Sequence, residues 1–533
     1  MYSRREFLRT ASLAGSAVVL NFRELVSKPR GATFFGLHEF VESHPDAVFV
    51  LRTGVDSKTN TSALKDVGHQ LGRTLFVAKL DSVAGFPVSA NVVLKPNITS
   101  WYWDKTPIEQ TMGIQTDPYF VEGVVNSLFD LTILAQNTYI REANYSPNQI
   151  DGTWYSDLAK RTGLNLKDFP QVAQMASQDV QWTDVPNGVW FSKIPHLWPV
   201  NSPGSCLINI AKFKSHSMGM TLCSKNLQGT NAIPYVSHCT AWGTAMSGVD
   251  TKHVVSNAFA NIKTNYDRHT AANIPRWDLP GSGSGGLWME THASRCLDNN
   301  SVLHPVLNII EGVYGREGPF VSGPDANGGA TGYGRDIMTN VVIFGKNSFH
   351  VDIIGAYLAG HEPGNFGLFH LALERGLSKY LNPHEIPLFE WKLDGSASSS
   401  RVENFPQTPI RTLYLRKAGE PAYHMVNEPY NYGGTTAVVE QKHQVPDVFA
   451  IQQNFPNPFN PSTSIQYYIP EAGDVRLEVF DIRGQVVDVL IDSWLPAGDH
   501  VRMWNSERRP SGTYFYRLLY KGSAQTKSMI LLK

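Results

Sequence analysis

The sequence has no long hydrophobic run after its N-terminus, little charge and no closely spaced cysteines. No stretch of eighteen apolar residues follows residue 20, so no segment has the length and composition of a membrane-spanning helix. Charged residues make up 17% of the 533 residues and the net charge is −1, which argues against electrostatic binding of nucleic acid. The four cysteines form no C-x-x-C, which excludes a ferredoxin-type cluster, a c-type haem site and a cysteine-based zinc knuckle. Two disulfides, in any of three pairings, are compatible with an exported protein.

The N-terminus has the pattern of an export signal over residues 1–30. Ser3–Arg9 supplies a charged region and Ala11–Leu20 a short apolar region. The Arg4-Arg5 pair, followed by Phe-Leu, resembles the twin-arginine signal. This resemblance implies that the twin-arginine translocase carries the folded protein out of the cytoplasm. Cleavage near Gly15–Ala17 and retention of the N-terminus are both compatible with the sequence.

Residues 31–400 show the pattern of an α/β domain. Four short apolar runs predict buried strands, at 90–94, 207–211, 306–310 and 340–344. Helices are expected between them, one capped by Thr116 or Asp117 and another over 349–359. Strands of this kind, alternating with helices, predict a mostly parallel sheet with helices on its faces. Residues 401–445 are more polar and predict a connector.

Polar residues follow these runs at the edge where parallel α/β sheets bind their ligands. The lysines and amides of this group predict a site for a small anionic ligand, since ammonium groups are natural partners of carboxylate or phosphate. These anion-site candidates are Lys95, Asn97, Lys212, Lys225 and Asn226.

Three further side chains in the same positions could perform chemistry. His216, Lys214 and Glu311 are the catalytic candidates, with His216 as a general base. As an alternative, Asp352, Glu311 and His216 supply the nitrogen and oxygen ligands of a divalent metal. Structural explanations compete with these. The lysines could lie in a solvated loop, Glu311 could cap backbone groups, and Asp352 could form a salt bridge with a lysine.

Five ordered segments of this domain carry a family resemblance. VVLKPNITS, TDPYFVEGVV, LINIAKFKSHSMGMTLCSKNLQGT, LNIIEGVYGREGP and FHVDIIGAYLAG resemble the motifs of the domain of unknown function 362 family, over about residues 40–395. Members often carry a ferredoxin-like iron–sulfur module, which this sequence lacks. The resemblance implies an architecture and candidate residues but no reaction. It leaves the cofactor open, and a divalent metal is one that the candidate residues suggest.

The last part of the chain, residues 446–533, predicts a small antiparallel sandwich. After the proline-rich segment 453–463, strands with alternating apolar residues are expected at 464–469, 475–480, 485–491, 500–504, 513–519 and 529–532. The segments QNFPNPFNPST, FDIRGQVV, PAGDHVRMW, SGTYFYRL and MILLK resemble the C-terminal sorting domain of type IX secretion. This resemblance implies the type IX machinery as a partner and passage through the periplasm to the outer surface or the medium.

The sequence therefore predicts an exported α/β protein with an anion- or metal-assisted site. The first hypothesis is an enzyme of redox or group-transfer type. The alternative is a non-catalytic envelope or surface protein that binds an anionic ligand. No nucleic-acid partner is expected.

Overall fold

The computed structural model describes most of the chain in two compact units, Met1–Tyr432 and Gly433–Lys533. The described residues are 33–80, 85–98, 112–143, 154–167, 176–216, 219–232, 253–276, 286–414, 420–434, 449–451, 453–454, 457–495, 498–506 and 509–532. The expected signal, residues 1–30, lies outside them. None of the helices in these ranges combines the length and the apolar character needed to cross a membrane.

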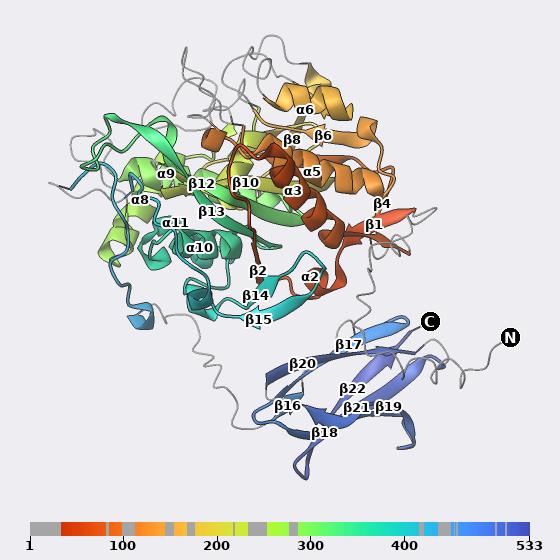
Figure 1. Cartoon of the computed structure of the whole chain (residues 1–533). Helices are drawn as coiled ribbons and strands as arrows, with labels where there is room; N and C mark the ends of the chain where they lie inside the picture. The colour runs from red at the N-terminus through yellow and green to blue at the C-terminus, as the bar shows by residue number, and fades with distance from the viewer. Residues whose placement is uncertain are drawn as a thin grey trace, which may run out of the picture. The chain divides into compact units, whose positions relative to one another are not determined.

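The larger unit is built on a ten-stranded, mostly parallel sheet, as the sequence predicts (Figure 1). The strands occur in the order β15 (Ala397–Ser400), β14 (Leu388–Trp391), β2 (Val48–Arg52), β13 (Gly332–Gly345), β12 (Leu307–Gly323), β10 (Cys206–His216), β5 (Val92–Pro96), β6 (Thr138–Ile140) and β7 (Asn165–Leu166), with β11 (Gly219–Thr221) beside β10. Two smaller sheets join β1 (Phe34–Leu37), β3 (Phe76–Lys79) and β4 (Phe86–Pro87), and β8 (Val180–Asp184) with β9 (Lys193–Leu197).

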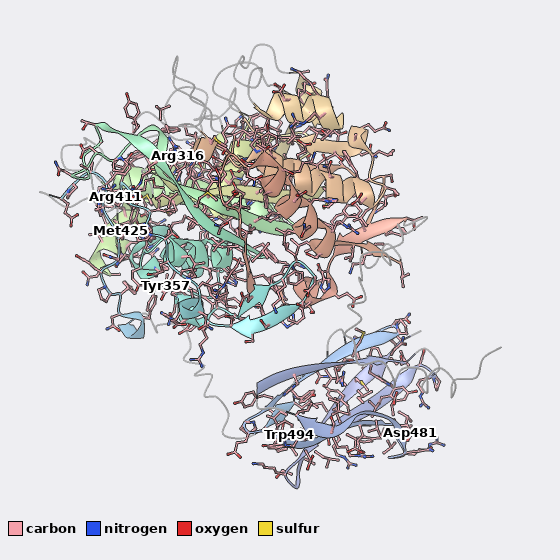
Figure 2. All side chains as sticks on the ribbon, viewed as in Figure 1. Arg316, Tyr357, Arg411, Met425, Asp481 and Trp494 are labelled. Atoms are coloured by element: carbon pink, nitrogen blue, oxygen red, sulfur yellow. The ribbon has the colours of Figure 1, made fainter. Side chains whose placement is uncertain are left out.

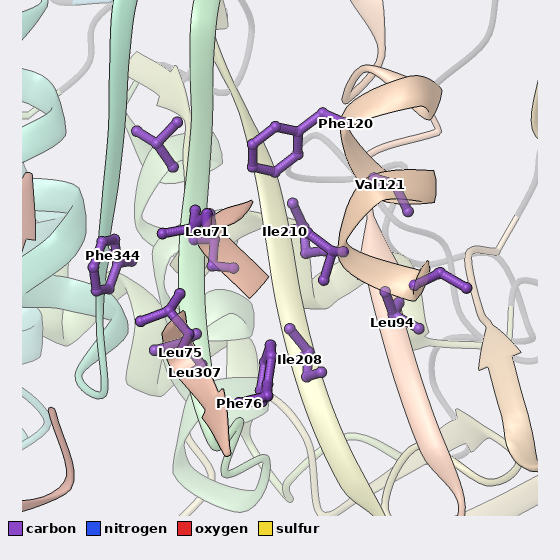
Figure 3. Packing of buried hydrophobic residues seen from close by; sticks show 14 of the residues in the cluster. Leu71, Leu75, Phe76, Leu94, Phe120, Val121, Ile208, Ile210, Leu307 and Phe344 are labelled. Atoms are coloured by element: carbon purple, nitrogen blue, oxygen red, sulfur yellow. The ribbon is translucent and has the colours of Figure 1, made fainter. Parts of the chain in front are cut away.

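Helices cover both faces of this sheet. One face packs against α3 (Thr61–Leu75), α5 (Pro118–Asp130) and α6 (Trp154–Thr162). The other face packs against α9 (Leu287–Val302), α10 (Ser348–Leu358) and α11 (Gly367–Glu374). Figure 3 shows the first core, where Phe120 of α5 lies near Ile210 of β10. Because strand side chains alternate in direction, the central strands β2, β13, β12 and β10 contribute apolar residues to both cores. The remaining helices are α2 (Glu39–Ser43), α7 (Cys223–Asn226) and α8 (Ala258–Ala271).

The predicted helix starts are confirmed. Asp117 is the N-cap of α5 and accepts hydrogen bonds from the backbone N–H groups of Tyr119 and Phe120 at 2.8 and 3.0 Å. Pro118 occupies the first turn, where its missing N–H costs nothing. The helix after β13 begins at Ser348 and ends before Gly360, whose φ of 81° suits glycine.

Two features of the sheet differ from the sequence prediction. β10 and β12 are longer than expected, so Lys212, Lys214, His216 and Glu311 lie within strands and not after them. β13 runs antiparallel to β12. The connection between them, 324–331, is too short for a parallel crossover, so the two strands form a long hairpin. The helix that carries Asp352, α10, therefore follows a strand that runs antiparallel to both of its neighbours, β12 and β2.

Part of the segment expected to be a connector belongs to the larger unit. Ile410 and Tyr414 are fully buried in the second core, together with Val402, Phe405 and Val426. Of the four cysteines, Cys206 and Cys223 are buried thiols outside any disulfide, so the pattern of two disulfides does not form.

The smaller unit contains two antiparallel sheets that share one apolar core. One sheet has the order β16 (Ala450–Ile451), β17 (Ser462–Ile469) and β20 (Gly498–Asn505). The other has the order β19 (Val486–Leu495), β18 (Gly473–Phe480), β21 (Gly512–Tyr520) and β22 (Ser523–Leu531). All six predicted strands are present. The turn from β18 to β19 is fixed by the carboxylate of Asp481, labelled in Figure 2, which accepts hydrogen bonds from the N–H groups of Arg483 and Gln485.

Candidate functional site

Lys212 forms a buried salt bridge with a carboxylate inside the protein. Its Nζ donates to Glu311 Oε2 at 2.6 Å and lies 3.4 Å from the centroid of the Tyr314 ring. The pair forms because Lys212 and Glu311 are opposite each other on the parallel strands β10 and β12. Glu311 also accepts the backbone N–H of Asp117 at 3.1 Å, and the Tyr314 hydroxyl donates to Asp117 Oδ2 at 2.7 Å. Burial raises the pKa of both carboxyls. All four side chains are fully buried, so this group is an internal network.

Lys95 forms a second internal ion pair, on the other face of the sheet. Its Nζ donates to Glu142 Oε2 at 2.6 Å, to Pro96 O at 2.8 Å and to Asn226 Oδ1 at 3.1 Å. Glu142 follows β6 directly and also accepts the N–H of Ile98. Burial lowers the pKa of Lys95 and raises the pKa of Glu142, and the pairing offsets both shifts. Lys95 therefore has an internal carboxylate as its partner.

The short helix α7 is held in place by buried polar side chains at both ends. At its start, Asp352 of α10 accepts the N–H groups of Cys223 and Ser224 at 2.7 and 2.8 Å. At its end, Asn226 donates to Lys95 O at 2.9 Å and to Asn209 Oδ1 at 2.8 Å. These bonds fix the backbone on either side of Lys225.

Gly229, which follows α7, must be a glycine. A Cβ atom there would lie 2.0 Å from Glu142 Oε1 and 2.8 Å from Lys95 Cε. The Gly229 carbonyl also accepts the N–H of Ala143 at 2.6 Å. In the segment Lys225–Gly229, Asn226 and Gly229 therefore fix the backbone that carries Lys225.

Lys214 and Lys225 differ from the other two lysines because no carboxylate of the described chain pairs with them. Lys214 is buried, and within the described ranges its Nζ donates to two carbonyl groups, Ile114 O at 2.6 Å and Pro319 O at 3.2 Å. Burial, followed by the charges of Lys225 and Arg316, holds the pKa of Lys214 well below its usual range. Lys225 is only partly buried. Within the described residues, Lys214 and Lys225 are therefore two positive side chains without a salt-bridged carboxylate, and the nearby charge of Glu142, already paired with Lys95, acts on both.

Two buried histidines lie within the electrostatic reach of Lys225. Burial lowers the pKa of His216 well below 6.5, and the charges of Lys225, His292 and Lys214 add to this effect. Burial, Lys225 and Arg295 lower the pKa of His292 in the same way. Both imidazoles are therefore neutral near pH 7 and are able to accept a proton at one ring nitrogen.

The structure brings some predicted site residues together and separates others. Lys95, Asn97 and Asn226 share one network, in which Asn97 Nδ2 donates to Asn226 Oδ1 at 3.3 Å. Lys212 and Glu311 share another. Both oxygens of Glu311 are occupied, since Oε1 accepts the N–H of Val313. Lys214 and Lys225 form no salt bridge with a carboxylate of the described residues, and both of their charges act on His216.

The three predicted metal ligands do not form a metal site in the described ranges. No three His, Cys, Asp or Glu side chains there are arranged so that they could hold an ion. The carboxylate of Asp352 caps α7, and the carboxylate of Glu311 pairs with Lys212. The structural role expected for Asp352, a salt bridge to a lysine, is replaced by this helix cap, because α7 presents two unpaired N–H groups to it.

Sequence reasoning missed Glu142, Asp117 as a site residue, and His292. Glu142 carried a usable signal, because Arg141-Glu142 directly follows the apolar run Thr138–Ile140, as Lys95 follows Val92–Leu94. His292 carried no signal, because it lies in the middle of a helix with little amphipathic pattern.

The fold and the site define an α/β protein with a separate β-sandwich and a buried cluster of lysines and histidines. The comparisons agree with both parts. Residues 92–357 match the model of the Domain of unknown function (DUF362), and residues 453–532 match the Secretion system C-terminal sorting domain. The chain thus carries a DUF362 domain and a type IX sorting domain. None of the curated proteins compared with the chain matches it.

The sorting domain establishes the destination of the protein in outline. It indicates export to the outer surface or the extracellular medium and an interaction with the type IX secretion machinery.

Proposed function

We propose that the DUF362 domain binds a small oxyanion, a carboxylate or a phosphate, with Lys225 as its charged anchor. The observation that carries the proposal is the division of the four lysines. Lys95 and Lys212 each pair with a buried carboxylate, whereas Lys214 and Lys225 have none in the described chain. An anionic ligand supplies the missing counter-charge, and charge-assisted hydrogen bonds to it are among the stronger contacts available to a protein.

Burial separates the roles of these two lysines. Lys225 is partly exposed and accessible to a ligand, whereas Lys214 is 1% exposed and held by two carbonyls. Lys214 therefore acts on the ligand through its field. The rigid attachment of α7 by Asp352 and Asn226 lowers the ordering cost of placing Lys225 against the anion.

We favour an enzyme of group-transfer type, in which His216 accepts a proton from the bound substrate. The lowered pKa of His216 keeps its ring neutral and available as a general base. A non-catalytic binding protein is the second candidate, because the lysine pair alone is sufficient to hold an anion. The absorption spectrum and metal content of the purified protein separate these classes, since a bound chromophore or a stoichiometric metal favours the enzyme.

Calorimetric titration with inorganic phosphate and with acetate tests the binding proposal. Lys225→Met should weaken the better ligand by about 1.5–3 kcal/mol, which is roughly 10- to 150-fold. Lys214→Met should weaken it less and leave thermal stability intact, since it removes a buried charge that has no carboxylate partner.

Lys346→Met is the matched control. Lys346 is a partly exposed lysine of the same unit that pairs with Glu42. Equal affinities for the wild type, Lys225→Met and Lys346→Met would remove the basis of the proposal, as would a wild-type protein that binds neither anion.

For the route of export, we propose that the twin-arginine translocase moves the folded protein into the periplasm before the type IX machinery acts. The pattern of residues 1–30 supports this step. The buried ion pairs of the DUF362 domain form only on folding, which fits a route that carries folded cargo.

A further inference from the structure

His292 of α9 has a buried ring nitrogen that has no hydrogen-bond partner among the described residues. The residue is 2% exposed, and its Nε2 lies 3.6 Å from the Sγ atom of Cys296, one helical turn away. Its Nδ1 makes no hydrogen bond to any residue in the described part of the chain. A buried polar atom left unpaired costs about 1–3 kcal/mol, so such atoms usually have a partner. The unpaired Nδ1 therefore suggests that a ligand supplies the missing hydrogen bond.

The neighbours of His292 favour one of the two positions of its ring proton. Gln228 Nε2 donates a hydrogen bond to Cys296 Sγ at 2.6 Å, so the sulfur accepts from one side. The thiol hydrogen can then be donated to His292 Nε2. An Nε2 that accepts a hydrogen bond places the single proton of a neutral imidazole on Nδ1. The unpaired atom is then an N–H donor that needs an acceptor.

The charges around His292 indicate what that acceptor is. The helix of His292, α9, is hydrogen-bonded to the segment that carries Lys225, because Asn300 Nδ2 donates to Ser224 O at 2.9 Å. The positive charges of Lys225 and Arg295 add to burial in lowering the pKa of His292. A cationic ligand is disfavoured in this field. An oxyanion satisfies both the Nδ1–H donor and the ammonium group of Lys225.

We propose that His292 Nδ1–H and Lys225 Nζ bind the same oxyanion, and that Cys296 is a positioning residue that holds His292 in the required tautomer. The ligand is accordingly an oxyanion, a carboxylate or a phosphate, with oxygens that reach both donors. This inference rests on the proposed function and deepens it, because it adds His292 as a second donor that selects ligands with an acceptor oxygen.

A pair of isosteric substitutions tests the role of Nδ1. The amide nitrogen of His292→Asn can occupy the position of Nδ1, whereas that of His292→Gln reaches the position of Nε2. In titrations with phosphate and acetate, His292→Asn should bind within about threefold of the wild type, and His292→Gln should bind at least about tenfold more weakly. A role limited to packing predicts no such split. Equal affinities for the two variants overturn the inference.

Histidine-selective ¹⁵N NMR of the full chain gives a second readout that does not depend on either variant being stable. The His292 resonances, assigned by comparison with Cys296→Ser, should show the Nδ1–H tautomer. Cys296→Ser should retain that tautomer, because a hydroxyl also donates to Nε2, and Cys296→Ala should lose it. An Nε2–H tautomer in the wild type overturns the inference.

The two proposals fail differently. Anion binding that is lost in Lys225→Met but unchanged in His292→Gln removes only the inference about His292. Anion binding that is unaffected by Lys225→Met removes the proposed function and the inference together.

Discussion

The ion pair between Lys95 and Glu142 gives the sharpest test of the division between structural and ligand-binding lysines. Glu142→Gln keeps the shape of the side chain and removes its charge. Among the described residues, Lys95 Nζ would then have only neutral acceptors, namely the introduced amide oxygen, Pro96 O at 2.8 Å and Asn226 Oδ1 at 3.1 Å. A fully buried ammonium without a counter-ion should lower the free energy of unfolding by about 3–5 kcal/mol, which is a large part of the stability of an ordinary domain.

The reverse change, Lys95→Met, should have a similar cost because Glu142 is left buried with only the N–H of Ile98. The double variant removes both charges, so it should lose about 3–5 kcal/mol and not the sum of the two single effects. The resulting coupling energy is about 3–5 kcal/mol. Urea denaturation followed by circular dichroism at about 222 nm is suitable, because the described helices all lie in the larger unit.

Additive effects of the two changes would refute the assignment of Lys95 to an internal pair. So would a loss below about 1 kcal/mol in Glu142→Gln together with tighter phosphate binding. That outcome would restore Lys95 as the anion-binding lysine that the sequence predicts.

Three other predictions concern Asp352, the bounds of the larger unit and the N-terminal signal. Burial raises the pKa of Asp352 to about 7 from 3.8, so the folded protein keeps a proton that the unfolded chain releases. This stabilisation is complete below about pH 4 and is lost as the pH rises through about 7. The free energy of unfolding, measured by urea titration, should therefore fall between about pH 5 and pH 8 by roughly 2–3 kcal/mol more in the wild type than in Asp352→Asn. A fragment of residues 31–432 should melt like the larger unit of the full chain, whereas residues 31–400 should melt far lower because they lack apolar residues of the second core, and equal melting temperatures would contradict this. Replacement of Arg4 and Arg5 by lysines should retain the protein in the cytoplasm in cell fractionation, and normal export would indicate a general secretory signal.

The fold was predictable where the sequence pattern is local. Alternating apolar residues between turn residues located all six strands expected in the sandwich, and the Asp-Pro pair located the start of α5. The direction of β13 was not predictable, because an apolar run has the same pattern in either direction. The short connection 324–331 decides the direction. The ends of β12 and β13 beside this connection are polar, so the apolar runs alone do not show how few residues separate the two strands.

The lysines of the candidate site stand out in the sequence, whereas their buried partners and His292 do not. The sequence indicates that Lys95, Lys212, Lys214 and Lys225 lie near one another. Which of them pairs with a carboxylate depends on strand register, as in the opposition of Lys212 and Glu311, and this register arises only from the folded sheet.

Crystals of the protein grown with tungstate or selenate test the central claim most directly, because the anomalous signal locates the anion. The account predicts a peak within hydrogen-bond distance of Lys225 Nζ and His292 Nδ1, with the pair between Lys95 and Glu142 intact. A peak on Lys95 with Glu142 displaced, or peaks only on the outer surface, would contradict it.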